Sequence, residues 1–329
     1  MHFRDIIGND NIKLQLQIAS QAARINNTSI PHVLFAGAAG CGKTSMAKAL
    51  SKDVRTNLIK VPPESLKTSQ DLLDISENMN YSGYNKYGNV VGQRKPSILF
   101  LDEIHKMPLS GQESLGIAME EWYTATKNKW TREVDNIWLP RFTVVGATTL
   151  EGKLSKPFRD RFKLIFYFET YDFDLSVQIV KKHAELNKIQ ITDGAAIEIA
   201  KRSRGVPRVM VSYLTNCADA ATVAEMELVD EVATTSMFNI MGIDDKGLTR
   251  SDIKVLKSLY KSGMPVGLDT LSVMTDISGQ TIQNAIEPYL IQTGLILRSS
   301  RGRLITKKGL EYLVLNKHIE PKRKFGLGE

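Results

Sequence analysis

Cysteine is scarce in this sequence of 329 residues, with only Cys41 and Cys217, which lie far apart. Neither has a second cysteine at C-x-x-C spacing, so the sequence predicts no disulfide framework and no zinc site. Thiols that stay reduced are typical of the cytoplasm, and we expect a cytoplasmic location.

Long apolar runs are missing as well. No stretch of the sequence approaches the roughly 18–20 apolar residues that a membrane helix needs. Residues 1–5 do not show the apolar core of a secretory signal. The composition is 42% hydrophobic and 24% charged, which is ordinary for a globular protein with two or three domains at this length. These absences exclude a membrane-spanning protein and a disulfide-rich secreted one.

The charge balance is moderately basic. Forty-three Lys and Arg residues against 36 Asp and Glu give a net charge of +7, which favours an anionic partner only in general terms. The end of the chain is more strongly basic, and its nine basic residues are Arg298, Arg301, Arg303, Lys307, Lys308, Lys317, Lys322, Arg323 and Lys324. Such a tail is either a solvated end or a contact for a polyanion.

Residues 1–170 alternate between helical and strand patterns. Short apolar runs suited to buried strands are His32–Ala36, Leu58–Val61, Ser97–Leu101 and Phe142–Gly146. Helical spacing of apolar residues occurs at Asn11–Arg24 and Thr44–Ser51. Strands that alternate with helices predict an α/β domain whose mostly parallel sheet is covered on both faces.

Two further domains are predicted after residue 170. Residues 171–243 read as a small all-helical domain, with helices expected at Leu175–Leu186, Gly194–Arg202, Pro207–Ala224 and Asp230–Met237. Residues 244–329 read as a winged-helix domain with a basic tail. Its helices are expected at Ser251–Tyr260, Leu268–Met274 and Thr281–Gln292, and its two strands at Leu295–Arg298 and Arg303–Thr306.

The sequence Gly37-Ala38-Ala39-Gly40-Cys41-Gly42-Lys43-Thr44 is a G-x-x-x-x-G-K-T motif between a predicted strand and a predicted helix. Glycines let backbone N–H groups approach phosphates, and a helix N-terminus favours negative charge. Lys43 would reach the β- and γ-phosphates, and the Thr44 hydroxyl would bind Mg²⁺. A glycine-rich turn without a ligand is the alternative, but the strand, full motif and helix together favour the phosphate site.

Paired carboxylates follow the apolar strand Ser97–Leu101. Asp102 would serve the metal ion, and Glu103 would hold and deprotonate the water that attacks the γ-phosphate. An apolar strand that ends in Asp-Glu is common by itself. We interpret this pair as a metal ligand and a base because a phosphate motif precedes it by about sixty residues.

Three shorter patterns are ambiguous individually. Thr148 ends another apolar strand, Arg161 follows a short predicted helix, and Arg208 falls in the first turn of a helix that begins at Pro207. Each also has a structural explanation, as a core threonine, a solvated basic turn or a surface ion pair.

The order of these motifs resembles the AAA+ ATPases, and several stretches resemble more closely the RuvB-type Holliday junction branch-migration ATPases. The matching stretches are 101–105, 145–149, 157–162, 202–208, 265–271, 286–292 and 298–303, and the similarity runs from about Ile6 to Lys308. The resemblance implies ATP and Mg²⁺ as cofactors. It implies that Thr148 is a nucleotide sensor, that Arg161 is an arginine finger acting on a neighbouring subunit, and that Arg208 is a second sensor.

Further site residues follow from the same resemblance. The implied nucleotide-binding residues are Ile7, Gly40, Gly42, Lys43, Thr44, Ser45 and Arg208, and the implied metal ligands are Thr44 and Asp102. The DNA contacts would be Arg298, Arg301 and Arg303. A site completed in trans implies a ring, which in this family is a homo-hexamer around double-stranded DNA at four-way junctions, with a RuvA-like junction-binding partner.

The sequence departs from the family pattern in four places. In the phosphate loop, Ala38-Ala39 and Cys41 replace residues that are commonly proline and leucine, while the required Gly, Lys and Thr remain. The sequence begins close to Ile6-Ile7-Gly8, so residues that precede this segment in relatives and help to hold adenine are not expected. Leu150 stands where relatives usually have an arginine. The stretch Trp122–Leu139, with Lys127, Lys129, Trp130, Arg132 and Trp138, matches poorly where relatives have a hairpin that docks the RuvA partner.

Three function classes fit an ATPase of this kind. The first is a DNA motor that branch-migrates Holliday junctions in recombination and repair. The second is a clamp-loader-like ATPase that acts on a protein partner on DNA, but such loaders usually carry a helical collar instead of a basic winged helix. The third is a transcription regulator that uses ATP only as a ligand, which the intact Glu103 disfavours.

Overall fold

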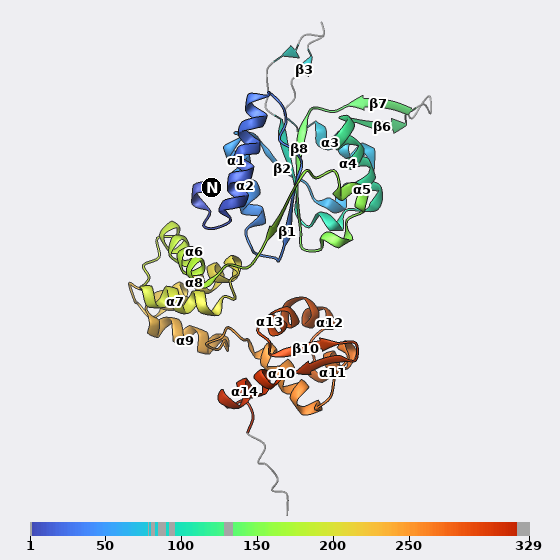
Figure 1. The fold of residues 1–329 in the computed structure, drawn as a ribbon. Coiled ribbons are helices and arrows are strands. Elements are labelled where there is room, and N and C mark those ends of the chain that lie inside the picture. Colours follow the sequence, from blue (N-terminus) through green and yellow to red (C-terminus); the bar gives the residue numbers. More distant parts are fainter. Residues whose placement is uncertain are drawn as a thin grey trace, which may run out of the picture. The chain divides into compact units, whose positions relative to one another are not determined.

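The computed structural model describes residues 2–77, 79, 83–84, 90–91, 96–127 and 134–320. The described chain forms two compact units, one of Met1–Ile179 with Val206–Arg208 and the other of Val180–Gly205 with Val209–Glu329. Figure 1 shows the sheet in the first unit and the helices that follow it. Lys129, Trp130, Arg132, Lys322, Arg323 and Lys324 lie outside the described residues.

A five-stranded sheet in the order β2-β5-β8-β1-β9 forms the centre of the first unit. All four pairings between these neighbours are parallel, which confirms the predicted parallel sheet. Its strands are β1 (Val33–Gly37), β2 (Leu58–Lys60), β5 (Ser97–Leu101), β8 (Phe142–Thr148) and β9 (Leu164–Phe168). The strand β9 is not among the predicted strands, and its place at the sheet edge depends on pairing with the distant β1.

Helices cover both faces of this sheet (Figure 1). On one face α1 (Asp10–Ile25) and α2 (Lys43–Asp53) share a buried apolar cluster with Val33 and Phe35. On the other face, the cluster that contains Leu34 also holds residues of α3 (Ser69–Ser76), α4 (Leu109–Glu121) and α5 (Lys156–Arg159). Successive residues of β1 therefore point to opposite faces, as strand geometry requires.

Small antiparallel pairs extend from the first unit. The pair β6 (Tyr123–Lys127) and β7 (Val134–Trp138) forms a hairpin, and β3 (Gly83–Tyr84) pairs with β4 (Val90–Val91). Short 3-10 helices lie at Phe3–Asp5, Pro63–Ser65, Ile104–Lys106 and Glu151–Lys153.

The second unit begins with a group of helices, as predicted for the segment after residue 170. They are α6 (Phe173–Leu186), whose first half belongs to the first unit, α7 (Asp193–Arg202), α8 (Pro207–Val223) and α9 (Glu231–Met241). Pro207 is the first residue of α8, where its missing N–H removes no helical hydrogen bond.

The C-terminal part of the second unit is a winged helix, which confirms the predicted fold class. Its helices are α10 (Arg250–Ser262), α11 (Leu268–Thr275), α12 (Gly279–Thr281), a π-helical turn (Ile282–Ile286), α13 (Glu287–Gln292) and α14 (Lys307–Leu315). The strands β10 (Ile296–Ser299) and β11 (Gly302–Ile305) form the antiparallel wing. The sequence analysis missed α14, which adds Tyr312 and Leu313 to the core of this domain. No helix of the described residues is both long and apolar enough to cross a membrane.

One buried histidine connects the sheet to α4. The His32 Nδ1 atom accepts the N–H of Val144 at 2.9 Å, and its Nε2 atom lies 3.0 Å from the Met119 carbonyl oxygen. The ring is therefore neutral, with its proton on Nε2. Burial lowers the pKa of His32, partly offset by the Met119 carbonyl.

We expect this histidine to make stability depend on pH. Because the pKa of His32 is lowered in the folded state, the unfolded chain binds more protons once the pH falls below the ordinary histidine pKa. The stabilisation is thus present above about pH 6.5 and is lost on acidification, by up to about 1.4 kcal/mol per pH unit. Urea unfolding followed by tryptophan fluorescence, from about pH 7.5 to about pH 5.5, should show a flatter profile for His32→Gln. The exposed His2 provides the control, since His2→Gln should keep the wild-type slope.

Candidate nucleotide site and DNA-binding surface

The glycine motif forms a loop between β1 and α2, as the sequence predicts. Gly40 and Gly42 have φ values of 82° and 99°, a region that side chains other than glycine rarely adopt. A Cβ atom at Gly40 would also lie 2.9 Å from the Arg208 Cβ. The glycines therefore permit both the loop conformation and the close approach of another segment.

The Lys43 side chain lies inside this loop. Its Nζ atom donates to the carbonyl oxygens of Gly37 at 2.6 Å and Ala38 at 2.8 Å. Burial lowers the pKa of the Lys43 ammonium, and the charges of Glu103 and Asp102 counteract part of this shift. A bound polyphosphate would favour the charged ammonium in the same way, so the lysine fits a phosphate site.

Thr44 and Ser45 belong to the first turn of α2, where free backbone N–H groups favour an anion. The Thr44 hydroxyl donates to the Asp102 carboxylate at 3.3 Å. A hydroxyl and a carboxylate are ligands that suit Mg²⁺, which usually keeps water and substrate phosphate as its other ligands. The described residues contain no cluster of three or more His, Cys, Asp or Glu side chains suited to a metal, so these two oxygens fit a cation held mainly by phosphate and water.

Glu103 follows β5 in a left-handed conformation, with φ of 51°. Its Oε2 atom accepts hydrogen bonds from the Thr149 N–H at 3.2 Å and the Thr149 hydroxyl at 2.9 Å. The His105 Nδ1 atom lies 3.2 Å from the same oxygen. This carboxylate is therefore held at one defined place beside the loop.

Thr148 is fully buried and lies one residue before the threonine that contacts Glu103. The Thr148 hydroxyl lies 2.9 Å from His105 Nδ1 and accepts the Leu150 N–H at 3.0 Å. Burial lowers the pKa of His105, although the Glu103 charge opposes this shift. Thr149 and His105 lie within the family-like stretches 145–149 and 101–105, but the sequence pattern assigns neither of them a role.

The segment that contains Ile7 also lies near the loop, through Tyr171. A Cβ atom at Gly8 would lie 2.8 Å from the Tyr171 ring, and one at Gly42 would lie 3.8 Å from its hydroxyl. The Tyr171 hydroxyl accepts from Asn9 Nδ2 at 2.6 Å, and burial raises its pKa to about 12. Tyr171 is thus a neutral aromatic side chain between Gly8 and the loop, which the sequence analysis did not identify.

The two predicted arginines occupy different places. Arg208 is exposed, and its backbone N–H donates to the Gly40 carbonyl oxygen at 3.3 Å. Arg161 is held instead by α4 and α5, since it donates to the carbonyl oxygens of Gly116 at 2.8 Å and Pro157 at 2.6 Å. Its guanidinium also lies 3.4 Å from the Glu120 carboxylate.

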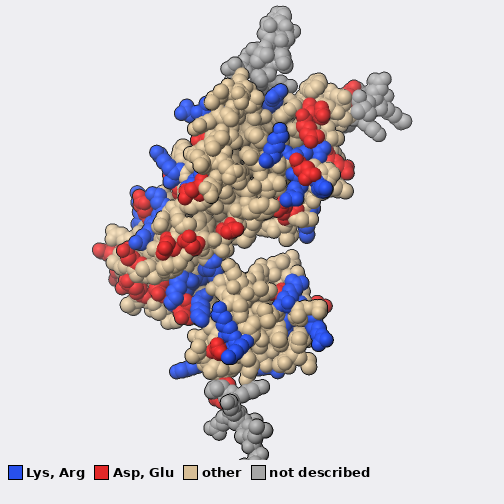
Figure 2. All heavy atoms as spheres, viewed as in Figure 1, with Lys and Arg blue, Asp and Glu red and all other residues tan. Residues whose placement is uncertain are grey.

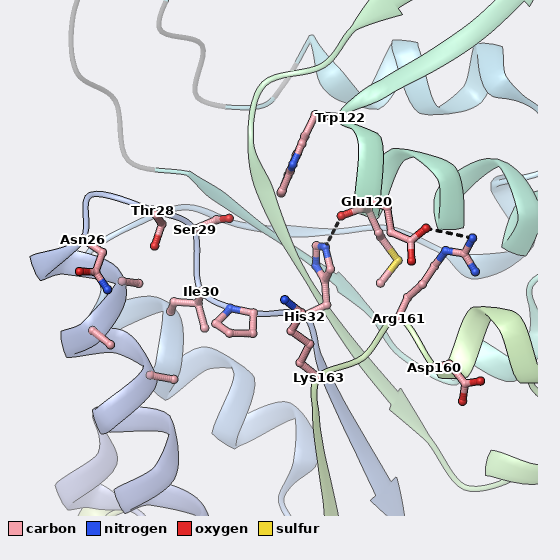
Figure 3. Close-up of a pocket in the computed structure, with 15 residues that line it drawn as sticks. Asn26, Thr28, Ser29, Ile30, His32, Glu120, Trp122, Asp160, Arg161 and Lys163 are labelled. Carbon is pink, nitrogen blue, oxygen red and sulfur yellow. Dashed lines mark hydrogen bonds and ion pairs between the residues drawn. The ribbon is translucent and has the colours of Figure 1, made fainter.

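Arg161 lines a cavity of about 620 Å³ that the nucleotide-loop residues do not line. Figure 3 shows the Arg161–Glu120 ion pair on one side of this cavity and the end of α1, marked by Asn26, on the other. Lys163 and His32 also line it. The structure therefore separates Arg161 from the Lys43 site of its own chain.

The three predicted DNA-binding arginines differ in exposure, although Arg298 and Arg303 both lie near the Glu287 carboxylate, with Arg298 Nη1 4.0 Å from it. Arg298 and Arg301 are exposed, at and near the turn of the wing. The expectation that Arg303 is an exposed DNA contact needs correction. Its side chain is only 8% exposed and binds Glu287 through two hydrogen bonds of 2.9 and 3.0 Å. The guanidinium of Arg303 therefore already binds a buried carboxylate, which distinguishes it from the two exposed arginines.

Charge on the surface does not locate a DNA-binding face by itself. Figure 2 shows basic and acidic side chains interspersed over the first unit in this view. On the β6–β7 hairpin, Trp138 is 71% exposed and Ile137 is 41% exposed, at the end of β7 that pairs with the start of β6. Singly exposed apolar side chains are common on protein surfaces, so these two do not identify a binding surface by themselves.

Family comparisons match consecutive parts of the chain. Residues 1–168 match the family described as the Holliday junction DNA helicase RuvB P-loop domain. Residues 171–244 match the RuvB AAA lid domain, and residues 245–314 match the RuvB C-terminal winged-helix domain.

Individual relatives agree with these matches. The chain is 35% identical over 317 residues to the Holliday junction branch migration complex subunit RuvB of Streptococcus agalactiae serotype Ia, which covers 95% of this chain and 91% of the relative. The relative from serotype III of the same species gives the same values.

Solved structures show the same similarity. The Thermotoga maritima RuvB Holliday junction branch migration motor superposes with a TM-score of 0.78 at 31% identity, covering 95% of this chain and 96% of that one. A variant of that protein gives a TM-score of 0.79 at 32% identity, with coverage of 95% and 97%. The chain therefore belongs to the RuvB family of Holliday junction DNA helicases, the family that its phosphate loop, helical segment and winged helix had indicated.

Proposed function

We propose that this protein is an ATP-driven motor that branch-migrates Holliday junctions during recombination and repair. The observation that carries the proposal is the set of side chains around the phosphate loop: Lys43 in the loop, Thr44 bound to Asp102, and Glu103 fixed by Thr149. The chain adds a winged helix to this ATPase site, and relatives of the same family carry the name of a branch migration complex subunit.

The ATPase site works through charge and orientation. Lys43 and the first turn of α2, with Ser45, would bind the phosphates of ATP, and Thr44 with Asp102 would hold Mg²⁺. Mg²⁺ supplies charge neutralisation on the phosphates. Gly40 and Gly42 give the backbone room, Ile7 and Tyr171 would lie on the nucleoside side, and Arg208 would sense the nucleotide from its contact with Gly40.

Glu103 would accept a proton from the attacking water. A general base must have a defined position, and the two hydrogen bonds from Thr149 provide one. Thr148 would serve as the sensor through His105, because the Nδ1 atom of this histidine lies close to both the Thr148 hydroxyl and the Glu103 carboxylate.

Arg161 would act on the nucleotide of a neighbouring subunit. Its position on the α4 and α5 side, next to a cavity separate from the Lys43 loop, supports action in trans. An arginine suits this role because its fixed charge and planar fork stabilise the transferring phosphoryl group. We therefore propose a homo-hexameric ring around double-stranded DNA.

The remaining assignments follow from the same proposal. Domains of 1–170, 171–243 and 244–329 would provide the ATPase site, the lid and the DNA contact. Arg298 and Arg301 would contact DNA phosphates, and the β6–β7 hairpin with its exposed Trp138 would dock a RuvA-like protein. The location would be cytoplasmic. A clamp-loader-like function is less favoured because the chain carries the β10–β11 wing where such loaders usually carry a helical collar.

The Glu103→Gln variant tests the proposed function directly. It should bind an ATP analogue nearly as well as the wild type and should hydrolyse ATP at least about 100-fold more slowly, because it lacks the base. Wild-type protein with ATP and Mg²⁺ should separate the arms of a labelled synthetic four-way junction, and the variant should not. Glu113→Gln, which changes an exposed glutamate of α4, is the control. Wild-type hydrolysis by Glu103→Gln would exclude Glu103 as the base.

Mixed rings test the trans role of Arg161. Lys43→Ala and Arg161→Ala proteins should each be inactive alone. Random mixing of equal amounts should restore about one active interface in four, those that join an intact Lys43 site to an intact Arg161. ATP hydrolysis is measured after native mass spectrometry has shown that mixed rings form. A mixture no more active than its components would place Arg161 in its own subunit's site.

Substitution of the exposed wing arginines should affect DNA binding, whereas substitution of the buried one should affect stability. Arg298→Ala with Arg301→Ala should weaken duplex binding equally on unrelated sequences and flatten the slope of log affinity against log salt by about 0.9 per lost contact. Arg303→Ala should instead destabilise the winged helix, by about 3 kcal/mol, because Glu287 loses its buried partner. Hydrogen exchange in β10 and α10 measures the second effect.

The control for these variants removes the buried pair as a whole. Arg303→Met with Glu287→Leu should recover most of the stability and keep the wild-type salt slope. The contrary outcome is that this double variant flattens the salt slope as much as the Arg298 and Arg301 changes do. That result would mean that Arg303 contacts DNA phosphates even though it is buried here.

A further inference from the structure

The loop between α7 and α8 holds an arginine in an unusual conformation. Arg204 has φ of 57° and Gly205 has φ of 70°, so two consecutive residues are left-handed. Non-glycine residues adopt this region less often than glycine does. The Arg204 side chain is only 17% exposed and makes several contacts.

These contacts all lie in the winged-helix domain or in the link that leads to it. Arg204 Nε and Nη2 both donate to the Gly247 carbonyl oxygen, at 2.8 and 2.6 Å. Nη2 also donates to Asp252 Oδ2 at 2.5 Å. The guanidinium carbon lies 4.2 Å from the centre of the Tyr289 ring, a distance at which a cation is attracted to an aromatic face.

Asp252 connects Arg204 to the beginning of α10. The Asp252 side chain is 1% exposed, and its Oδ2 atom also accepts from the Thr249 N–H at 2.7 Å and the Thr249 hydroxyl at 2.6 Å. Thr249 is the N-cap of α10 and forms a capping box with Asp252. One carboxylate thus fixes both the start of the first winged-helix helix and the guanidinium of Arg204.

The link between the domains is also held closely against α7. A Cβ atom at Gly247 would lie 2.3 Å from the carbonyl oxygen of Arg202, the last residue of α7. The Tyr289 hydroxyl donates to the Lys246 carbonyl oxygen at 2.7 Å. The link is therefore packed and hydrogen-bonded around Arg204, and it does not behave as a free tether.

The other end of the same loop contacts the phosphate loop. The Arg208 N–H donates to the Gly40 carbonyl oxygen, and a Cβ atom at Gly40 would lie 3.0 Å from Val206 Cγ1. Only four residue steps separate Arg204 from Arg208, and such a segment reaches at most about 14 Å when fully extended. Arg204 and Arg208 therefore stay within this distance of each other however the segment moves.

We infer that Arg204 is the residue that couples the nucleotide site to the DNA-binding domain, an inference that rests on the proposed motor function. The Arg204–Asp252 pair attaches the winged helix to the loop that leads into the segment 206–208. Without the pair, the ATPase site and the wing would both remain intact but would move independently. Arg204 is a positioning residue in this role, and it contacts neither nucleotide nor DNA.

The test uses the double variant Arg204→Gln with Asp252→Asn in the full-length protein. The single variant Arg204→Gln would leave a buried carboxylate without its charged partner, whereas the double variant removes both charges and keeps an oxygen that can cap α10. The control is Lys307→Gln with Glu311→Gln, which removes an exposed pair at 3.9 Å on α14 of the same domain. Two rates are measured: ATP hydrolysis on linear duplex DNA, and displacement of a labelled third strand from that duplex.

We expect the double variant to bind duplex DNA and hydrolyse ATP within about two-fold of the wild type, while displacement per ATP falls about ten-fold or more. The control pair should match the wild type in both rates. Unchanged displacement per ATP in the double variant would overturn the inference. So would a proportional loss of hydrolysis and displacement, because that result indicates a merely structural pair.

A second measurement separates this inference from the motor function itself. If wild-type protein hydrolyses ATP but displaces no strand, the proposed function has failed, and hydrogen exchange then decides the role of Arg204. An ATP analogue should change the exchange of amides in 244–262 of the wild type and the control pair but not of the double variant. The same change in all three proteins would overturn the coupling role.

Discussion

The parallel sheet of the first unit determines where the phosphate loop, the two carboxylates and Thr148 lie. Because the strands run in the same direction, their carboxyl ends meet at one edge. The glycine loop follows β1, Asp102 and Glu103 follow β5, and Thr148 ends β8, with β8 paired to both of the other strands. The Thr44–Asp102 and Glu103–Thr149 hydrogen bonds are direct results of this arrangement. A change in strand order would disperse these side chains even if every motif remained in the sequence.

Arginine has three different physical roles in this protein, and burial and partner charge distinguish them. Arg303 is a buried partner of Glu287, and its contribution depends on the carboxylate remaining opposite it. Arg204 also binds a buried carboxylate, but it joins two segments that are distant in sequence. Arg161 is partly exposed beside a cavity, where the carbonyl oxygens of Gly116 and Pro157 hold its direction. Its guanidinium also lies 3.4 Å from the exposed Glu120 carboxylate, so its partner charge is at the surface and not buried.

Neutral polar groups complete the first unit in a similar way. His32 joins Val144 of β8 to the end of α4 because one ring nitrogen accepts and the other donates. His105 lies between Thr148 and Glu103, and burial lowers its pKa. Tyr171 lies between Gly8 and the phosphate loop, with its hydroxyl accepting from Asn9. His105 and Tyr171 hold groups near the phosphate loop in this way, whereas His32 joins the sheet to α4 away from the loop.

The sequence by itself determined the features that depend on local pattern. The G-x-x-x-x-G-K-T motif requires its glycine conformations wherever it occurs, apolar runs predicted four of the five central strands, and the Asp-Glu pair followed from the end of such a run. Tertiary structure decided the features that depend on partners distant in the chain. Arg298, Arg301 and Arg303 look equivalent in sequence, but the antiparallel wing places Arg303 opposite Arg298, where the buried Glu287 binds it. Likewise Thr149, His105, Tyr171 and Arg204 gain their roles from contacts with Glu103, Gly8 and Asp252. Burial and charge pairing between remote residues are properties of packing, so no periodicity along the chain could have shown them.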